Sequence, residues 1–180
     1  MSRSIIGLTG KKQSGKDTAA SILIREYDFL SLAFADEIKA FIFKMYPMIR
    51  EEHLWGEKKE EYIESLDTTP RKLMQSIGEG MRTIDPAIWI RPISTDLFNN
   101  PHANIVITDV RHDNEIKLIR YLGGVIWNVK RYPYTMVDTN PSENSITLEP
   151  DGTLHNLGTL DDFYSVVRHM WKSYSKHEGA

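Results

Sequence analysis

The residues best suited to chemistry near the start of the chain are two glycines and a lysine. Residues 4–18 read SIIGLTGKKQSGKDT, and Gly10, Gly15 and Lys16 have the spacing G-x-x-x-x-G-K of a phosphate-binding P-loop. Glycines let successive backbone N–H groups point at one anion, a helix N-terminus adds partial positive charge, and lysine adds a full charge. The spacing predicts a loop that binds the phosphates of a nucleotide. The alternative is a chance glycine-rich turn.

A second pair of charged residues follows an apolar run. Residues 103–110 read ANIVITDV, with Asp109 near the end of the run and Arg111 two positions beyond it. An acid in this place is typical of the group that holds Mg²⁺ beside a P-loop, directly or through water; the alternative is an aspartate that caps a helix. An arginine here can form two parallel hydrogen bonds with phosphate oxygens. We interpret the pair as candidates for phosphoryl transfer.

Three other arginines and a tryptophan are further candidates. Arg71 lies near the start of one expected helix and Arg82 just beyond its end, and Arg131 follows an expected strand. Each is either a clamp on a polyanionic ligand or an ordinary surface residue. Trp89 either stacks on a base or packs in the core. No set of nucleophile, base and orienting residue stands out, which favours direct transfer without a covalent enzyme intermediate.

These residues need a scaffold, and the pattern of the chain predicts one. Apolar runs of strand length alternate with segments of helical periodicity. We expect strands at 5–8, 29–35, 103–110, 125–130 and 153–156, and helices at 18–27, 37–45, 70–77, 86–98, 112–122 and 161–174. The alternation predicts an α/β fold of three layers, the P-loop NTPase arrangement, in which a parallel sheet of about five strands has helices on both faces. The loops after the strands then converge on one site.

Local signals set the limits of two helices and two irregular segments. Gly78 is expected to end the helix that begins at Pro70, and Asp85-Pro86 to begin the next. Residues 50–67 are highly charged and read either as a solvated helix face or as a segment that moves over a substrate. Residues 132–151 contain Pro, Asn, Asp and Ser throughout and predict a long loop, which at this length is usually either functional or disordered.

The composition of the chain limits the kinds of partner, site and location that we expect. The chain has 180 residues and reads as a single domain, with a net charge of −3 that gives no reason to expect nucleic acid or an acidic membrane as partner. It has no cysteine, which excludes disulfides and thiol catalysis, and its six histidines lack the spacing of a zinc site. No apolar run reaches the length of a membrane span and no signal peptide is evident, so we expect a soluble, cytosolic protein.

Taken together, five segments in order resemble the deoxynucleoside monophosphate kinases of bacteriophages, within the nucleoside monophosphate kinase group of P-loop proteins. The segments cover nearly the whole chain. They read GKKQSGKDT, LAFADEIK, PRKLMQSIGEGMRTIDPAIWI, ITDVRHDNEIKLIRYLGGVIWNVKR, and PSENSI followed by LHNLGTLDDF. Two departures are Asn140, where some members have His, and a short segment before Pro70. The resemblance implies transfer of the γ-phosphate of ATP, with Mg²⁺, to a deoxynucleoside monophosphate.

The resemblance also implies roles for individual residues. The strict P-loop places Ser or Thr directly after the lysine, and this group of kinases places it one residue later, so Thr18 joins Asp109 as a candidate for Mg²⁺. The expected catalytic residues are Lys16, Arg111 and Arg131. The expected ATP-binding residues are Gly10, Lys12, Ser14, Gly15, Lys16, Asp17 and Thr18. The expected acceptor-binding residues are Asp17, Arg71, Gln75, Arg82, Trp89, Arg111, Glu115, Ser142 and Glu143.

The resemblance further implies an arrangement of parts. A substrate-side helical segment at about 36–100 and a lid-like loop at about 132–151 would belong to one kinase domain spanning 1–180, acting in the host cytoplasm if the chain comes from a bacteriophage. A homodimer is left open. Two alternatives remain: a kinase of another phosphorylated small molecule, such as phosphomevalonate or dephospho-coenzyme A, and a non-catalytic module that binds nucleotide.

Overall fold

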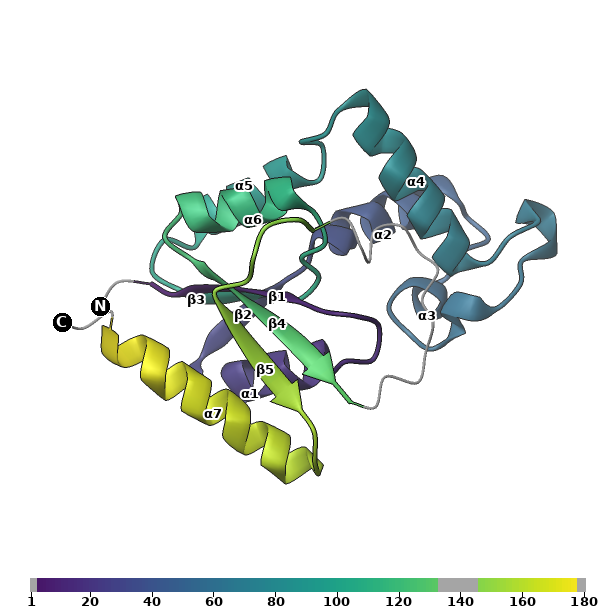
Figure 1. The fold of residues 1–180 in the computed structure, drawn as a ribbon. Coiled ribbons are helices and arrows are strands. Elements are labelled where there is room, and N and C mark those ends of the chain that lie inside the picture. Colours follow the sequence, from purple (N-terminus) through teal and green to yellow (C-terminus); the bar gives the residue numbers. More distant parts are fainter. Residues whose placement is uncertain (1–2, 133–145, 178–180) are drawn as a thin grey trace. The chain divides into compact units, whose positions relative to one another are not determined.

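The fold was analysed in a computed structural model, which describes residues 3–132 and 146–177 (Figure 1). The chain forms two compact units. The first, the sheet unit, contains residues 1–33 and 98–180, and the second, the helical unit, contains residues 34–97. Ser142 and Glu143, expected to bind the acceptor, lie outside the described residues, as does most of the expected lid-like loop.

The sheet unit is built on a parallel five-stranded sheet, as the alternation of apolar runs predicts. Its strands are β1 (Ile5–Thr9), β2 (Phe29–Leu32), β3 (Asn104–Ile107), β4 (Val125–Arg131) and β5 (Gly152–Asn156). They lie in the order β2-β3-β1-β4-β5. The central strand β1 pairs with β3 on one side and with β4 on the other, both parallel. The segment that ends in the glycine loop therefore lies at the middle of the sheet.

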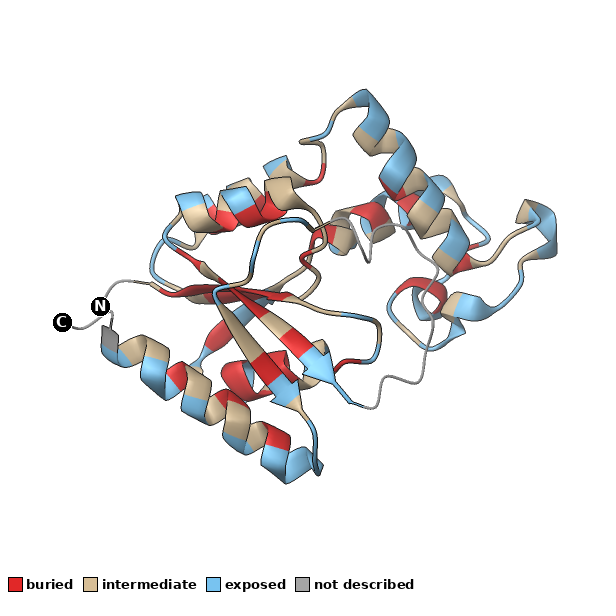
Figure 2. Cartoon of the chain, in the orientation of Figure 1, coloured by how far each residue is buried: buried red, intermediate tan, exposed pale blue. Residues whose placement is uncertain are grey.

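Helices cover both faces of this sheet. They are α1 (Lys16–Tyr27), α6 (Asp113–Tyr121) and α7 (Leu160–His177). Ile6 and Leu8 of β1 join the core formed with α1 and α7. A Cβ on Gly7, between them, would lie 2.7 Å from Ile119 Cδ1 of α6, so the alternate positions of β1 face α6. Figure 2 shows the buried residues concentrated along the central strands, which confirms the three-layer prediction.

The helical unit has its own apolar core. Its elements are α2 (Phe34–Met45), α3 (Glu51–Leu54), α4 (Pro70–Ile84) and α5 (Ile90–Asn99), with two single turns of 3₁₀-helix at Lys58–Glu60 and Glu64–Leu66. Ile38 and Ile42 of α2 pack with Leu54 and Trp89. Thr69 caps α4 by accepting a hydrogen bond from Lys72 N at 3.3 Å, with proline at the first helical position, as the sequence indicates.

Two helix limits predicted from the sequence are wrong. Gly78 does not end α4, because its lack of a side chain serves packing: a Cβ there would lie 3.1 Å from Ile38 Cδ1 of α2. Asp85-Pro86 does not begin α5 either. The Asp85 carboxylate accepts a hydrogen bond from Ala87 N at 3.0 Å, which forms a turn, and α5 begins only at Ile90.

The charged segment 50–67 is not one solvated helix. It consists of α3, the two 3₁₀ turns and an antiparallel bridge between Ile63 and Thr68. Its His53 is buried, and the Nδ1 atom of that ring accepts a hydrogen bond from Arg50 N at 2.9 Å. Among the described residues, no helix has both the length and the apolar character needed to cross a membrane.

Candidate active site

The glycine loop joins β1 to α1, as the motif predicts, and its glycines are required by its shape. Gly10 and Gly15 have φ angles of 134° and 110°, which side chains rarely permit. A Cβ on Gly10 would also lie 2.3 Å from the carbonyl oxygen of Val129 in β4. Gln13 adopts a φ of 61° between them without being glycine. Such strain is typical of functional loops.

Lys16 begins α1 and turns its ammonium group back over the loop. Its Nζ donates hydrogen bonds to the carbonyl oxygens of Gly10 at 2.6 Å and Lys11 at 3.0 Å. The positive charge is thereby held beside backbone N–H groups at a helix N-terminus, the arrangement that attracts phosphate.

Ser14 connects the loop with the far edge of the sheet. Its carbonyl oxygen accepts a hydrogen bond from Asn156 Nδ2 at 2.9 Å, and Asn156 is the last residue of β5. Ser14 is 2% exposed, and its Oγ has no hydrogen-bond partner among the described residues. Ser14 also lines the cavity described next.

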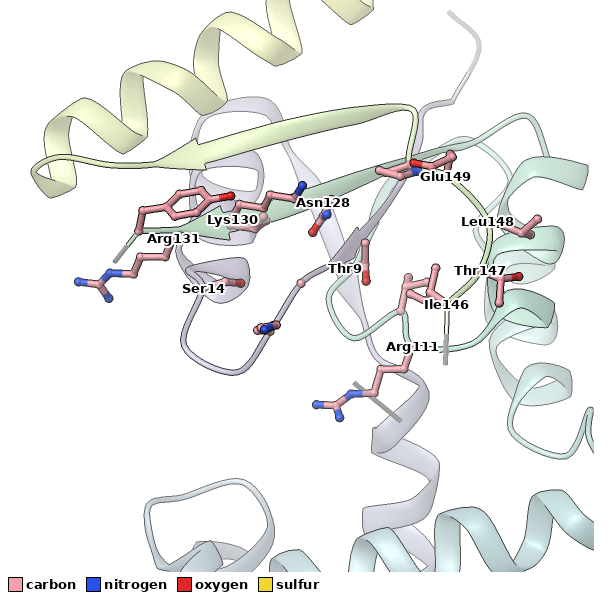
Figure 3. A pocket seen from close by; sticks show the side chains of 16 residues that line it. Thr9, Ser14, Arg111, Asn128, Lys130, Arg131, Ile146, Thr147, Leu148 and Glu149 are labelled. Atoms are coloured by element: carbon pink, nitrogen blue, oxygen red, sulfur yellow. The ribbon is translucent and has the colours of Figure 1, made fainter. Parts of the chain in front are cut away.

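The first of two cavities at the loop has a volume of about 460 Å³ and lies at the ends of β1 and β4. Thr9 and Asn128 are paired in register across β1 and β4, so their side chains lie next to each other in its lining. Figure 3 shows the labelled side chains around it. The polar residues of the lining are Thr9, Lys11, Ser14, Arg111, Asn128, Lys130, Arg131, Tyr132, Thr147 and Glu149. Its four cations outnumber the single carboxylate, so the cavity favours an anion.

Residues 146–150 form one wall of this cavity, and side chains of helix α6 hold them in place. The Asp113 carboxylate accepts hydrogen bonds from Thr147 N at 2.9 Å, from Leu148 N at 3.2 Å and from the Thr147 hydroxyl. The Thr147 hydroxyl lowers the pKa of Asp113, and the two backbone N–H groups add to the effect. Arg120 donates to Glu149 O at 2.6 Å. The wall is therefore fixed at two points along one helix.

Arg111 reaches the cavity from the turn between β3 and α6. Its backbone N–H donates to Glu115 Oε2 at 2.7 Å, and the backbone N–H of His112 donates to the same oxygen at 3.1 Å. Glu115 is 1% exposed. Its carboxylate faces the backbone of this turn, which differs from the expectation that Glu115 contacts the acceptor.

The second cavity is lined in part by the first residues of α1 and α7 and has a volume of about 370 Å³. Its lining combines the loop with the segment after β5: Gln13, Gly15, Lys16, Asp17, Thr18, Arg131, Asn156, Gly158, Leu160 and Phe163. Arg131, at the end of β4, lines both cavities. The guanidinium groups of Arg111 and Arg131 both extend past the strand ends (Figure 3). Lys12, expected to bind ATP, is absent from both linings.

The two metal candidates occupy different positions. Thr18 lines the second cavity beside Lys16. Asp109 lies two residues after β3 and is in neither lining. Residues 3–132 and 146–177 contain no group of three or more acidic or histidine side chains placed to hold a metal ion. Mg²⁺ that arrives with a nucleotide needs only one or two protein ligands besides phosphate and water, so Thr18 fits such an ion and Asp109 remains a candidate through water.

Three of the predicted acceptor residues lie on α4 in the helical unit. Arg71, Gln75 and Arg82 are spaced four and seven positions apart, which places them along one face of that helix. Arg71 forms an ion pair with Glu60, and Arg82 Nη1 lies 3.3 Å from Glu79 Oε1. Their contact with an acceptor remains a prediction.

Trp89 is a core residue and not a stacking platform. Its side chain is 6% exposed and packs in the apolar core of the helical unit. Its Nε1 donates to Gly78 O at 3.1 Å. A ring that stacks on a base needs an open face, so the core alternative for Trp89 is the correct one.

Several residues of the cavities were not identified from the sequence, among them Asn128, Thr9 and Asn156. Asn128 interrupts the apolar run VIWNVK near the carboxyl end of its strand, and such a polar residue in a buried strand is a signal for a site. Thr9 is the residue of β1 that is paired with Asn128 of β4. Asn156 belongs to the segment LHNLGTLDDF, which supports the family resemblance but indicates no role for the residue.

Comparison with known proteins identifies the family. The sequence model described as deoxynucleotide monophosphate kinase matches residues 4–69 and 58–167. A putative deoxynucleotide monophosphate kinase of Acanthamoeba polyphaga mimivirus is 32% identical over 184 residues, covering 91% of this chain and 93% of the relative. The deoxynucleotide monophosphate kinase of Enterobacteria phage T4 is 25% identical over 57% of this chain and 45% of its own length. The chain thus matches less than half of the phage enzyme.

Solved structures agree on the fold. Shikimate kinase from Aquifex aeolicus has a TM-score of 0.52 at 15% identity, covering 97% of this chain and 98% of its own. Dephospho-CoA kinase from Campylobacter jejuni has a TM-score of 0.52 at 14% identity, covering 99% and 100%. These likenesses show the fold alone. The glycine loop, the five-stranded parallel sheet and the match of the family model along most of the sequence lead to one conclusion: the chain belongs to the deoxynucleotide monophosphate kinase family.

Proposed function

We propose that the protein transfers the γ-phosphate of ATP to a deoxynucleoside 5′-monophosphate, giving the diphosphate. The observation that carries this proposal is the pair of cavities at the glycine loop, which share Arg131 in their linings. Phosphoryl transfer needs a donor and an acceptor aligned around a moving group whose negative charge is met by fixed positive charge. Membership of the family supports the same reaction.

The donor fits the second cavity. Its lining holds Lys16 and Thr18 at the start of α1, where phosphates are favoured, and the apolar side chains of Leu160 and Phe163 further along. A nucleotide has the same division into a charged and an aromatic end. Bound Mg²⁺ would supply further neutralisation of the phosphates, with Thr18 as its nearest candidate among the residues of the loop.

The first cavity fits the transferring phosphoryl group. Arg111 and the buried hydroxyl of Ser14 line it together, and Arg131 borders it from the end of β4. Fixed donors of this kind stabilise the charge that spreads over the equatorial oxygens during transfer. Arg71, Gln75 and Arg82, on one face of α4, are the proposed contacts for the acceptor nucleotide.

An assay of ADP formation tests the proposal. Purified protein is incubated with ATP and Mg²⁺, and with each of the four common deoxynucleoside monophosphates in turn. ADP formation that depends on at least one of them is expected. ADP formation with phosphomevalonate or dephospho-coenzyme A, and with none of the deoxynucleotides, would contradict the acceptor. Binding of ATP without turnover for any acceptor would identify a nucleotide-binding module instead.

A further inference from the structure

We propose that Glu115 is a positioning residue that holds Arg111 in place for phosphoryl transfer. This inference deepens the proposed function and rests on it. Glu115 is a buried carboxylate on α6, 1% exposed, and it lines neither cavity. Its effect on the reaction must therefore pass through the residues that it contacts.

Two hydrogen bonds of the Glu115 carboxylate reach the turn that carries Arg111. Its Oε2 accepts hydrogen bonds from Arg111 N at 2.7 Å and from His112 N at 3.1 Å, so a single oxygen binds two successive N–H groups. The backbone N–H of Glu115 in turn donates to His112 O at 3.1 Å. These bonds close the start of α6 onto the turn that carries Arg111.

The same turn is fixed from its other side. The backbone N–H of Val110 donates to Leu8 O of β1 at 3.1 Å. Arg111 therefore lies between a bond to the central strand and a bond to Glu115. Hydrogen bonds therefore hold the backbone on both sides of the Arg111 Cα, and the Arg111 side chain extends past the strand ends (Figure 3).

A carboxylate suits this task better than a neutral group. Burial of a charge is costly unless hydrogen bonds compensate for the lost water. Here two N–H groups and the positive end of the α6 dipole provide that compensation. Hydrogen bonds to a charged acceptor are about twice as strong as neutral ones, so Glu115 restrains the turn more firmly than a hydroxyl would. Displacing a catalytic group by roughly 1 Å can reduce the rate on the order of a hundredfold.

A double-mutant cycle in turnover separates positioning from general stability. We expect Glu115→Ala to lower kcat at least about tenfold and to leave the KM for ATP unchanged, because the glycine loop is untouched. Arg111→Ala should lower kcat on the order of a hundredfold or more. The double variant should be no slower than Arg111→Ala within about twofold, since Glu115 would have nothing left to position.

Two further variants keep the test decisive. Glu115→Gln keeps an acceptor oxygen but lacks the charge, so it should recover part, but not all, of the turnover lost in Glu115→Ala. If the alanine variant does not fold, the loss that remains in Glu115→Gln is the one measured in the cycle. Glu26→Gln weakens an exposed ion pair with Arg168 on the α1 and α7 side and serves as the matched carboxylate control, with unchanged kcat expected.

The outcomes distinguish the inference from the function on which it rests. Additive losses in the cycle, or normal kcat in a folded Glu115→Ala protein, would overturn the positioning role while leaving the kinase activity established. A wild-type protein that forms no ADP with any deoxynucleoside monophosphate would overturn the proposed function, and the positioning role with it. A loss of thermal stability without loss of kcat would assign Glu115 to folding alone.

Discussion

Asn156 and Ser14 are 142 residues apart in the sequence, and a hydrogen bond of 2.9 Å joins the side-chain amide of the first to the backbone of the second. The bond ties the end of β5 to the glycine loop. A Cβ on Gly15, the next residue of the loop, would lie 2.7 Å from the same amide nitrogen. The shape of the phosphate-binding loop is thus set partly by the opposite end of the chain.

Replacing Asn156 should weaken nucleotide binding. Asn156→Ala removes the bond to Ser14 O, and one hydrogen bond is worth about 1 kcal/mol. We expect the Kd for ATP, measured by calorimetry, to rise about threefold to tenfold. Asn156→Asp has nearly the same size but offers an acceptor where a donor is needed, so it should bind ATP no better than the alanine variant. Normal affinity in both would contradict the anchoring role.

Removing the charge of Lys16 should affect turnover more than folding. We expect Lys16→Ala to lower kcat/KM by a factor on the order of a hundred or more, because a fixed positive charge at the phosphates is lost. Its thermal unfolding should stay close to that of the wild type. Lys172→Ala on the exposed surface of α7 is the matched control and should retain full activity.

Acidification should release the cavity wall at residues 146–150. Hydrogen bonds from Thr147 hold the pKa of Asp113 below its ordinary value of 3.8. A pKa lowered by folding means that the stabilisation is complete above the ordinary value and is lost as pH falls through the folded value. We expect the protection factors of the Thr147 and Leu148 amides against hydrogen exchange to fall only below about pH 4.

Two controls accompany the acid experiment. Asp113→Asn should show reduced protection of the same amides already at pH 7, with little further change on acidification. The amides of β1 should remain protected over the range in which the wall is released. If they lose protection together with Thr147, the protein is unfolding globally and Asp113 does not act as a local clamp.

Two glycines of α4 should respond oppositely to alanine. A Cβ on Gly80 would meet nothing within 4 Å, so Gly80→Ala should raise the free energy of unfolding by about 0.5–1 kcal/mol through helix propensity. A Cβ on Gly78 would lie 3.1 Å from Ile38 Cδ1. We expect Gly78→Ala to gain nothing or to lose stability. Denaturant unfolding measures the free energy of unfolding of both variants. Equal gains would show that α2 can shift to make room for the new side chain without loss of stability.

Local patterns in the sequence predicted much of the sheet unit. The apolar runs identified all five strands, and the glycine spacing identified the loop, because strand burial and loop curvature depend on residue type at short range. The same patterns failed where contacts between residues far apart in the sequence determine the local structure. Gly78 lies inside its helix, where Ile38 leaves little room for a side chain, and Trp89 is buried in a core that it shares with residues of α2 and α3.

The site was only partly predictable for the same reason. Lys16, Ser14 and Thr18 belong to one motif and line the cavities as a group. The function of Glu115 depends on which way its carboxylate turns at the helix start, which no spacing rule gives. The bond from Asn156 depends on β5 lying within reach of the loop, a relationship that spans most of the chain.

The strand order also determines when the loop can form during synthesis. β1 leaves the ribosome before both of its partners, which are residues 105–107 of β3 and 125–128 of β4. Pairings of such sequence separation form slowly, and the central strand must wait for them. The bond from Asn156 requires a still later residue. The phosphate-binding loop therefore gains its full set of contacts only after β3, β4 and β5 have been synthesised.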